Sequence, residues 1–421
     1  MATKAENNQA LLDKVNGLIT SGEPKDLVYL AEVLKNITDG TTIEEILTTQ
    51  GDMVIMGASG LEVITKDNLL AGVGGGDNFV KPDNDVALFT KVNQYTISIP
   101  AGFKVKVGDA TTELVVAYDI NLNINGAGGL DTGGRTAGTD YYVFATTSGE
   151  FIASANKTLP SGYSLADVKL IGGFHYGLVG EAETATGNKT AADMTKIQGI
   201  NSYSFWDLKF RAVAGNEGMV LIGSKWYDIY LLNSEHITNG TSKAGATIAA
   251  GATDYGRAIP KIPLAYGGDN TLTYGKLTWF QLCEIAKSHG KELIGYDEFP
   301  AIAYGVSEGK SSSTDGYETV AGKVEHYPHL TSKYGIEQAT GVQYVWGRDL
   351  SEDGGTRTWQ DQTDSRGQIY AAANSPVAVQ LGGNRADGAG AGSRSSSWLH
   401  YVWNSGWTVG SRFACDHLKL V

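Results

Sequence analysis

The chain ends with GGNRADGAGAGSRSSSWLHYVWNSGWTVGSRFACDHLKLV, residues 382–421. This stretch begins with a run of Gly, Ala and Ser, turns abruptly aromatic, and closes with the compact apolar sequence FACDHLKLV. Aromatic side chains offer contact area at low entropic cost, and small residues let a surface adapt to what it touches. The segment holds no catalytic set of residues, so its composition predicts a recognition surface. Its aromatic part contains Trp398, His400, Tyr401, Trp403 and Trp407.

Length and charge restrict what the whole chain can be. Its 421 residues predict roughly two to four domains. With 46 acidic and 33 basic side chains, the formal net charge is −13. This charge excludes a sequence-independent nucleic-acid binder, because such a protein needs a basic face for phosphates. The 55 glycines are nearly twice the usual share of about 7 %, which is typical of many β turns.

The hydropathy pattern and the cysteines indicate where the protein is made. No signal peptide is visible in the polar first segment and no long apolar run occurs, so we expect synthesis in the cytoplasm and no membrane insertion. Two cysteines are too few for disulfides to be the main stabiliser. Cys283 and Cys415 either form one bridge or remain two reduced core thiols, and the second alternative is favoured.

The N-terminal region predicts helices followed by a joint. Residues 9–48 carry helical periodicity that is interrupted at Gly22-Glu23-Pro24, which predicts two short helices with apolar stripes. They form either an intramolecular hairpin or, as we favour, a small oligomerising or docking module. Residues 51–60 predict a strand. The glycine cluster at 72–77 predicts a flexible joint, since it lacks the spacing of a phosphate-binding loop.

Short alternating apolar runs dominate the next hundred or so residues, and they predict strands separated by Gly, Asp and Asn turns. The motif IGGFHYG follows, and we interpret its His175 as a satisfied core residue, because a lone histidine beside aromatic residues is more often core than ligand. An Ala/Thr-rich polar stretch at 181–200 predicts a domain boundary. The strands are expected at residues 95–99, 103–107, 113–118 and 141–145.

Helices are expected again after a dense aromatic block at residues 201–265. The first, Thr278–His289, carries an apolar stripe, and the second is predicted near residues 296–303. The rest of the chain reads as strands and loops with few regular segments.

The C-terminal region resembles a known family. GSR at residues 392–394, G-S-R again at 410–412 and CDHL at 415–418 are similar to the ending of the variable receptor-binding proteins of diversity-generating retroelements. Two further stretches, YDEFPAIAYGVSEG (296–309) and VQYVWGRDL (342–350), resemble the same family. The close resemblance covers residues 275–421, and its combination of motifs is more specific than any single one.

The resemblance implies a fold that is mainly β with some α. It comprises short N-terminal helices, a β-rich middle that is a β-prism or a small sandwich, and a C-terminal C-type-lectin-like α+β domain. The expected parts are an N-terminal attachment region, a β-rich fibre domain, a β-rich intermediate module and the lectin-like variable domain. They span residues 1–77, 78–195, 196–270 and 271–421, respectively.

The resemblance also implies a function. The chain is expected to be a receptor-binding protein at the tip of a phage tail fibre, diversified by a retroelement and part of the virion. Its expected partners are a host cell-surface protein or glycan, further copies in a homotrimer, and other tail proteins of the virion. Scaffold roles are implied for Arg394, Trp398, Arg412, Cys415, Asp416 and Leu418. Variable ligand-binding positions are implied at Asn384, Ala386, Asp387, Gly388, Ser397, Leu399, His400, Trp403, Asn404, Gly406, Thr408 and Val409, with Trp403 left open between contact and core.

We expect a binding protein rather than an enzyme. The alternatives that stay open are a lectin-fold enzyme or polysaccharide depolymerase, and a variable protein on a bacterial surface. No cofactor is implied, with a bound structural calcium or magnesium ion left open. Trp403-Asn404 is followed by Ser405 instead of Asp, so calcium-dependent sugar binding is not supported. His326 and His329 lack a nearby third ligand, and we interpret them as loop residues.

Overall fold

The computed structural model describes residues 52–57, 60–65, 78–182, 194–313, 327–352, 354–373 and 375–420. The chain divides into two compact units, Met1–Gly76 and Asp77–Val421. In the first unit, β1 (Asp52–Gly57) pairs antiparallel with β2 (Gly60–Thr65), and β1 lies where a strand is expected. The two predicted N-terminal helices and the joint at 72–77 lie outside the described residues.

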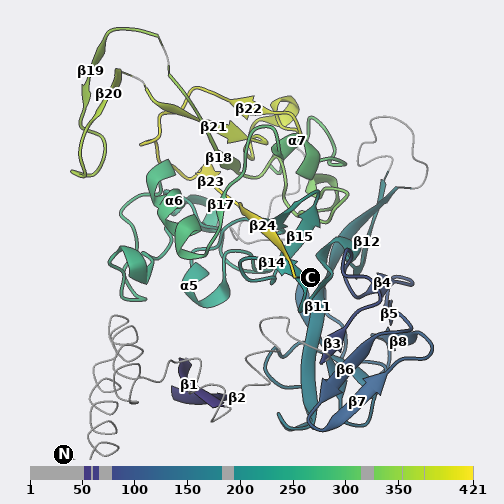
Figure 1. The fold of residues 1–421 in the computed structure, drawn as a ribbon. Coiled ribbons are helices and arrows are strands. Elements are labelled where there is room, and N and C mark those ends of the chain that lie inside the picture. Colours follow the sequence, from purple (N-terminus) through teal and green to yellow (C-terminus); the bar gives the residue numbers. More distant parts are fainter. Residues whose placement is uncertain are drawn as a thin grey trace, which may run out of the picture. The chain divides into compact units, whose positions relative to one another are not determined.

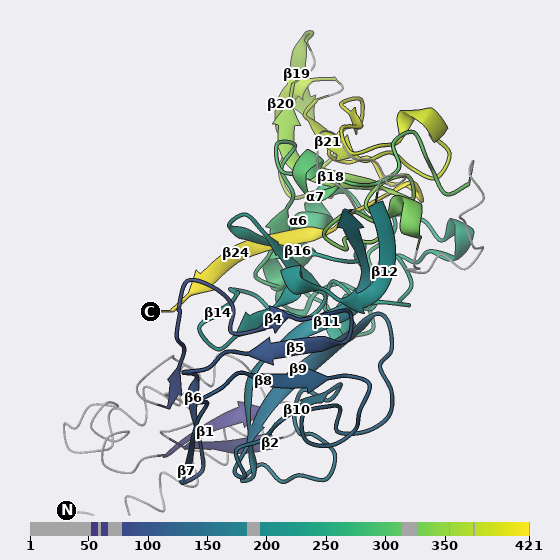
Figure 2. The same cartoon turned by 90° about the vertical axis from the view of Figure 1, so that its right-hand side faces the viewer.

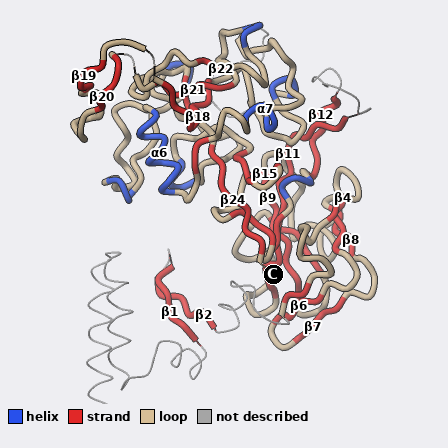
Figure 3. The backbone as a smooth tube through the Cα atoms, turned by 45° about the horizontal axis from the view of Figure 1, so that its top comes forward, coloured by secondary structure: helices blue, strands red, loops and turns tan. Residues whose placement is uncertain are grey.

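The second unit is built mostly of strands and loops with few helices, as Figure 3 shows. This arrangement confirms the expected mainly β class. Among the helices of the described ranges, none is both long and apolar enough to cross a membrane.

Residues 78–207 form small antiparallel sheets, which lie together in Figure 2. The sheet orders are β3-β6-β7, β4-β5-β8 and β10-β9-β11-β12, and β13 also pairs with β11. The predicted boundary between residues 195 and 196 falls within β12. The strands are β3 (Phe79–Val80), β4 (Thr90–Lys91), β5 (Thr96–Ile99), β6 (Lys104–Val107), β7 (Ala110–Glu113), β8 (Tyr118–Asn121), β9 (Thr139–Thr146), β10 (Phe151–Ser154), β11 (Val168–Ala182), β12 (Met194–Ile200) and β13 (Trp206–Asp207).

An aromatic core holds these sheets together. Phe103 and Phe151 are fully buried, with ring centres 6.1 Å apart. Phe79 meets Phe103 edge-on at 5.2 Å, and Tyr118 meets Phe151 edge-on at 5.0 Å. Edge-to-face pairs of this kind add stabilisation beyond the burial of apolar area.

The prediction of one strand over residues 113–118 is wrong. The structure ends β7 at Glu113 and begins β8 at Tyr118, and the two strands belong to different sheets. Val115 and Val116, which suggested a strand by their β propensity, are 88 % and 73 % exposed. The pair lies in a connection between sheets, which a one-dimensional pattern cannot distinguish from a buried strand. The other three predicted strands of this region are β5, β6 and β9.

The motif IGGFHYG lies in the middle of the long strand β11. A Cβ atom on Gly172 would lie 2.3 Å from the carbonyl oxygen of Trp206, so glycine is required where β13 crosses so closely. His175 is buried, with Nδ1 2.7 Å from Asp140 Oδ1 and Nε2 2.9 Å from the Tyr230 hydroxyl. These two hydrogen bonds confirm the interpretation of His175 as a satisfied core residue.

The C-terminal strand β24 (Phe413–Lys419) ties the rest of the unit together. It pairs with β14 and β16 on its two sides, and β15 extends the sheet in the order β14-β24-β16-β15, with β17 also paired to β24. The last residues of the chain therefore share a sheet with residues 210–228, which the sequence assigns to a separate module. The partner strands are β14 (Phe210–Ala212), β15 (Met219–Ile222), β16 (Lys225–Asp228) and β17 (Glu292–Leu293).

A second sheet, in the order β22-β21-β18-β23, lies at the end of the unit opposite β3–β10 (Figure 1). The hairpin of β19 and β20 projects beyond it. Trp359 and Tyr370 pair on this hairpin, with ring centres 5.3 Å apart. The strands are β18 (Tyr344–Ser351), β19 (Arg357–Gln360), β20 (Ile369–Ala372), β21 (Val377–Leu381), β22 (Ser396–Ser397) and β23 (Val409–Gly410).

Both helices predicted after residue 265 are present. α6 follows Thr278, whose side chain forms a capping box with Gln281, which fixes the start of the helix. The second is only one turn long. The α-helices are α5 (His236–Asn239), α6 (Trp279–Ser288) and α7 (Phe299–Ile302), and the 3-10 turns are η2 (Ser202–Ser204), η3 (Asp254–Gly256), η4 (Leu264–Tyr266), η5 (Pro328–Leu330) and η6 (Gly388–Gly390).

Cys283 and Cys415 are free thiols, as favoured from the sequence.

Candidate ligand-binding surface

The predicted recognition segment forms two loops on the sheet β22-β21-β18-β23. The first loop, residues 382–395, connects β21 to β22, and the second loop, residues 398–408, connects β22 to β23. β21 is buried at every position, and Gln380 and Leu381 pair with Ser397 and Ser396 of β22. A rigid strand therefore stands at the base of both loops, which is how scaffolds position binding residues.

Residues outside the segment hold the backbone of the first loop. The Glu308 carboxylate accepts hydrogen bonds from the backbone nitrogen and the hydroxyl of Ser393, at 2.9 and 2.5 Å. The Ser311 hydroxyl donates to the carbonyl oxygen of Arg385 at 2.8 Å and accepts from the nitrogen of Gly388 at 3.0 Å. These contacts fix the path of the loop through two side chains that do not belong to it.

The polar side chains inside the first loop are partly engaged with the loop itself. The Asp387 carboxylate accepts from the backbone nitrogen of Asn384 at 2.7 Å, and the Asn384 amide oxygen accepts from the nitrogen of Ala386 at 2.8 Å. Burial, and then a hydrogen bond with Asp387, raise the pKa of Tyr344 above 10.0. Asn384 and Asp387 therefore have a local structural role in addition to any contact with a ligand.

The second loop is anchored in the same way. Its turn is closed by the Asn404 amide oxygen, which accepts from the nitrogen of Tyr401 at 2.9 Å. The Ser405 hydroxyl accepts from the nitrogen of Leu277 at 2.9 Å, and the carbonyl of Gly406 accepts from the nitrogen of Gly251 at 3.0 Å. The loop is thus fastened to chain segments that lie far away in the sequence.

An aromatic and apolar patch is exposed on the second loop. Leu399 is 73 % exposed and Trp398 is 41 % exposed, and the Trp398 ring meets Tyr296 edge-on at 5.5 Å. Tyr401 and Trp403 form a further ring pair, with centres 5.2 Å apart. Tryptophan and tyrosine side chains are enriched among the residues that contribute most to binding at interfaces.

The structure distributes the predicted variable positions as follows. Ala386 and Leu399 are exposed, and Val409 is buried at 4 % exposure in β23, where its side chain packs in the core and cannot face a ligand. Trp403 is half-buried and packs against that core, so it serves partly as core and partly as surface. The remaining positions are half-buried: Asn384, Asp387, Gly388, Ser397, His400, Asn404, Gly406 and Thr408.

The implied scaffold residues divide into two groups. Arg412 and Cys415 are buried, and the Arg412 guanidinium donates to four backbone carbonyls, those of Asp228, Ile229, Glu337 and Gln338. Burial lowers the pKa of Arg412 to about 10, which still leaves it charged at neutral pH.

Trp398, Arg394 and Asp416 are exposed, and Leu418 is half-buried. Trp398 follows β22 directly, at the start of the second loop, and its 41 % exposure means that any scaffold role is not that of a buried core residue.

A cluster that the sequence does not reveal borders the second loop. Tyr255 is 44 % exposed and has a left-handed backbone, with φ of 56°. Its ring lies 4.8 Å from that of Trp407, and the Arg385 guanidinium lies 3.8 Å above the Tyr255 ring. Non-glycine residues in this conformation are strained, and they concentrate at functional sites. The only sequence signal at this position is the glycine that follows the tyrosine.

The chemistry of the surface is that of binding. Burial lowers the pKa of His400 below 6.5, so its imidazole is neutral at physiological pH. No group of three or more His, Cys, Asp or Glu side chains within the described ranges is placed to hold a metal ion. His329 Nδ1 lies 3.0 Å from the Ser307 hydroxyl, and His326 lies outside the described residues. Paired aromatic rings, an arginine and amide groups offer contacts to a ligand.

The chain is similar to known proteins of phage tails. The family model described as "Mtd second domain" matches residues 87–207. A tail fiber receptor-binding protein of Bordetella phage BPP-1 is 34 % identical over 348 residues, which cover 81 % of this chain and 85 % of that protein. The solved structure of the major tropism determinant U1 variant superimposes with a TM-score of 0.71 at 32 % identity, covering 89 % of this chain and 94 % of that one. The P3c variant gives 0.70 at 32 % identity with the same coverage.

Proposed function

The chain belongs to the family of phage tail-fibre receptor-binding proteins that includes the major tropism determinants, and we propose that it binds host-surface ligands through the two C-terminal loops. It is a receptor-binding protein of a phage tail, and we propose that it is located in the virion. Its ligand is a protein or glycan on the host cell. The proposed activity is binding without catalysis and without a cofactor.

One observation carries the proposal: the loop backbones are held by residues that lie outside the loops. Glu308 and Ser311 fasten the first loop, while Leu277 and Gly251 fasten the second. Side chains of such a loop that do not bond its backbone, such as those of Ala386 and Leu399, can be exchanged without moving the backbone. Asn384, Asp387 and Asn404 differ, because each accepts a hydrogen bond from a loop nitrogen. This separation of frame and contact is what diversification by a retroelement would require, and it supports the proposal that these positions vary.

The finer architecture is part of the same proposal. We assign the C-terminal part, residues 271–421, to a C-type-lectin-like domain and the preceding parts to the expected regions 1–77, 78–195 and 196–270. The chain is proposed to act as a homotrimer with other tail proteins, because several weak sites on one particle raise the effective concentration of each. Light scattering on the purified chain tests the trimer, and a monomer would contradict it.

A paired substitution tests the binding surface. In the test variant, Trp398→Ala and Leu399→Ala remove the exposed apolar patch of the second loop. In the matched control, Val115→Ala and Val116→Ala remove a more exposed apolar pair between β7 and β8. The binding of each fluorescently labelled protein is measured on bacteria that the labelled unmodified chain adsorbs to, and thermal unfolding is measured in parallel.

We expect the test variant to lose adsorption at an unchanged unfolding temperature and the control to adsorb like the unmodified chain. Equal adsorption by the test variant would refute the assignment of the surface. Incubation with host polysaccharide completes the test, because the release of oligosaccharides would favour the depolymerase alternative.

A further inference from the structure

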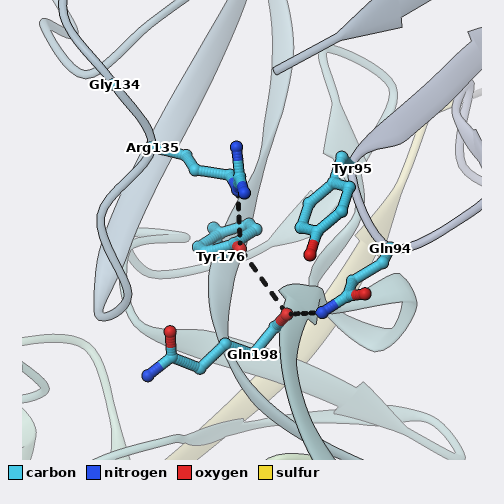
Figure 4. Close-up of a pocket in the computed structure, with 6 residues that line it drawn as sticks. All are labelled: Gln94, Tyr95, Gly134, Arg135, Tyr176 and Gln198. Atoms are coloured by element: carbon cyan, nitrogen blue, oxygen red, sulfur yellow. Dashed lines mark hydrogen bonds between the residues drawn. The ribbon is translucent and has the colours of Figure 1, made fainter. Parts of the chain in front are cut away.

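A polar pocket of about 380 Å³ opens in the β-rich part of the chain, on elements that do not include the two C-terminal loops. Gln94 and Tyr95 come from the turn before β5, and Arg135 comes from the connection between β8 and β9. Tyr176 of β11 and Gln198 of β12 complete the wall (Figure 4). Gly134 at the rim carries no side chain, and a Cβ atom there would meet nothing within 4 Å, so the pocket is open on that side.

Arg135 is held in a fixed orientation in this pocket. Its guanidinium lies over the Tyr95 ring, 4.0 Å from the ring centre, and Figure 4 shows the two groups facing each other. Its Nε donates to the Tyr176 hydroxyl at 3.1 Å, and one terminal nitrogen donates to the Asn123 amide oxygen. The Tyr95 ring covers one face of the guanidinium plane, whereas the N–H groups donate within that plane. The N–H edge of the guanidinium therefore stays available to a ligand.

The charge of Arg135 is not neutralised within the described part of the chain. No carboxylate there lies within salt-bridge distance of it, although the protein as a whole carries a net charge of −13. Of the five N–H groups of an arginine, the two hydrogen bonds engage two. The remaining N–H groups can bind a carboxylate in the bidentate geometry that arginine favours.

Neutral polar groups surround this cation. The Tyr176 hydroxyl lies between Arg135 and the carbonyl of Gln198, and the Gln94 amide nitrogen donates to the same carbonyl at 2.5 Å. The Tyr95 hydroxyl has no hydrogen-bond partner among the described residues, so it can donate to or accept from a ligand, whereas the Gln198 side chain points away from Tyr95 in Figure 4. The pocket thus combines one arginine with hydroxyl and amide groups.

We propose that this pocket binds an acidic saccharide, with the carboxylate of the sugar on Arg135 and its ring hydroxyls on Tyr95 and Gln94. A carboxylate alone would satisfy only the arginine, whereas a sugar hydroxyl both donates and accepts and therefore suits a phenol and an amide. The volume of the pocket accommodates a ligand of monosaccharide size. The site is separate from the proposed receptor-binding loops, and it gives the chain a second contact with a host surface that does not depend on them.

Titration of the full chain with three small probes tests the proposal. D-galacturonate presents a carboxylate and ring hydroxyls, D-galactose presents the hydroxyls without the charge, and acetate presents the charge alone. Binding is measured by ligand-observed NMR for the unmodified chain, Arg135→Gln and Tyr95→Phe. Arg357→Gln, which removes an exposed arginine of β19, is the matched control.

We expect galacturonate to bind roughly tenfold or more tightly than either other probe, and Arg135→Gln to weaken it roughly ten- to hundredfold. Tyr95→Phe removes only a hydroxyl that no described residue uses, so it should leave the fold intact and weaken binding roughly two- to tenfold. Arg357→Gln should bind like the unmodified chain.

Three results would overturn the proposal: no saturable binding of galacturonate, equal binding of acetate, or unchanged galacturonate affinity in a folded Arg135→Gln protein. Each of these results leaves the loop-dependent adsorption to bacteria untouched. The two proposals can therefore fail separately.

Discussion

Substitution of Arg412 by methionine removes the anchor beneath the two C-terminal loops and keeps most of its volume. The guanidinium donates to the carbonyl oxygens of Asp228 and Ile229 at 3.1 and 2.7 Å. It also donates to those of Glu337 and Gln338 at 2.9 and 3.0 Å. Because Arg412 stands between β23 and β24, these bonds join the end of the second loop to two segments that lie far from it in the sequence.

The magnitude follows from these four contacts. A hydrogen bond from a charged donor contributes about 1.5–3 kcal/mol, and each buried carbonyl left without a donor carries a desolvation cost. Against this, removal of the charge recovers the burial cost that lowers the pKa of Arg412 to about 10. The loss of four hydrogen bonds from a charged donor, less the recovered burial cost, leaves a net cost of about 3–5 kcal/mol, which is a large share of the roughly 5–15 kcal/mol that stabilises a typical native protein.

Denaturant unfolding of the full chain, followed by fluorescence, measures the loss. Arg394→Met is the control, because Arg394 is exposed and its substitution should change the free energy of unfolding by less than about 0.5 kcal/mol. Arg412→Lys keeps the charge but loses the planar fork, so it should fall between the two. A loss below about 1 kcal/mol for Arg412→Met would refute the role of anchor.

Three further predictions follow from the contacts described above. Arg385→Ala, which removes the guanidinium stacked on Tyr255, should weaken adsorption to bacteria about tenfold, and an unchanged affinity would exclude the cluster from the binding surface. Burial, and then the charges of His236 and Lys291, lower the pKa of His289 to about 4, so the folded state binds this proton less readily than the unfolded state. Stability should therefore be lost as the pH falls from about 6.5 towards 4, and His289→Gln should flatten this slope in denaturation curves measured across the range. Gly172→Ala would place a Cβ atom 2.3 Å from a backbone oxygen, so thermal unfolding should show a loss of about 1–3 kcal/mol, and an unchanged melting temperature would contradict the close crossing of β13.

Local patterns predicted many of the elements, and they failed where exposure decides. The alternating runs that became β5, β6 and β9, and the stripe that became α6, are periodic and lie on buried faces. The run at 113–118 has the same composition, but its valines are in solvent. An apolar pattern predicts the same strand whether or not another sheet covers those side chains. The sheet that would bury them comes from residues distant in the sequence, so the local pattern cannot reveal whether they are buried.

The sequence by itself determined the mainly β class and the small and aromatic composition of the last forty residues, from which a recognition surface is predicted, because composition and motif spacing are local properties. Only the tertiary structure decided which of these residues face outwards. Trp398 is exposed although it resembles a scaffold residue, Val409 is buried although it resembles a variable one, and Tyr255 joins the surface from more than a hundred residues away. The physical reason is that burial is set by partners from other segments. The carbonyls that bind Arg412 come from residues 228–229 and 337–338, and no pattern within the last forty residues contains them.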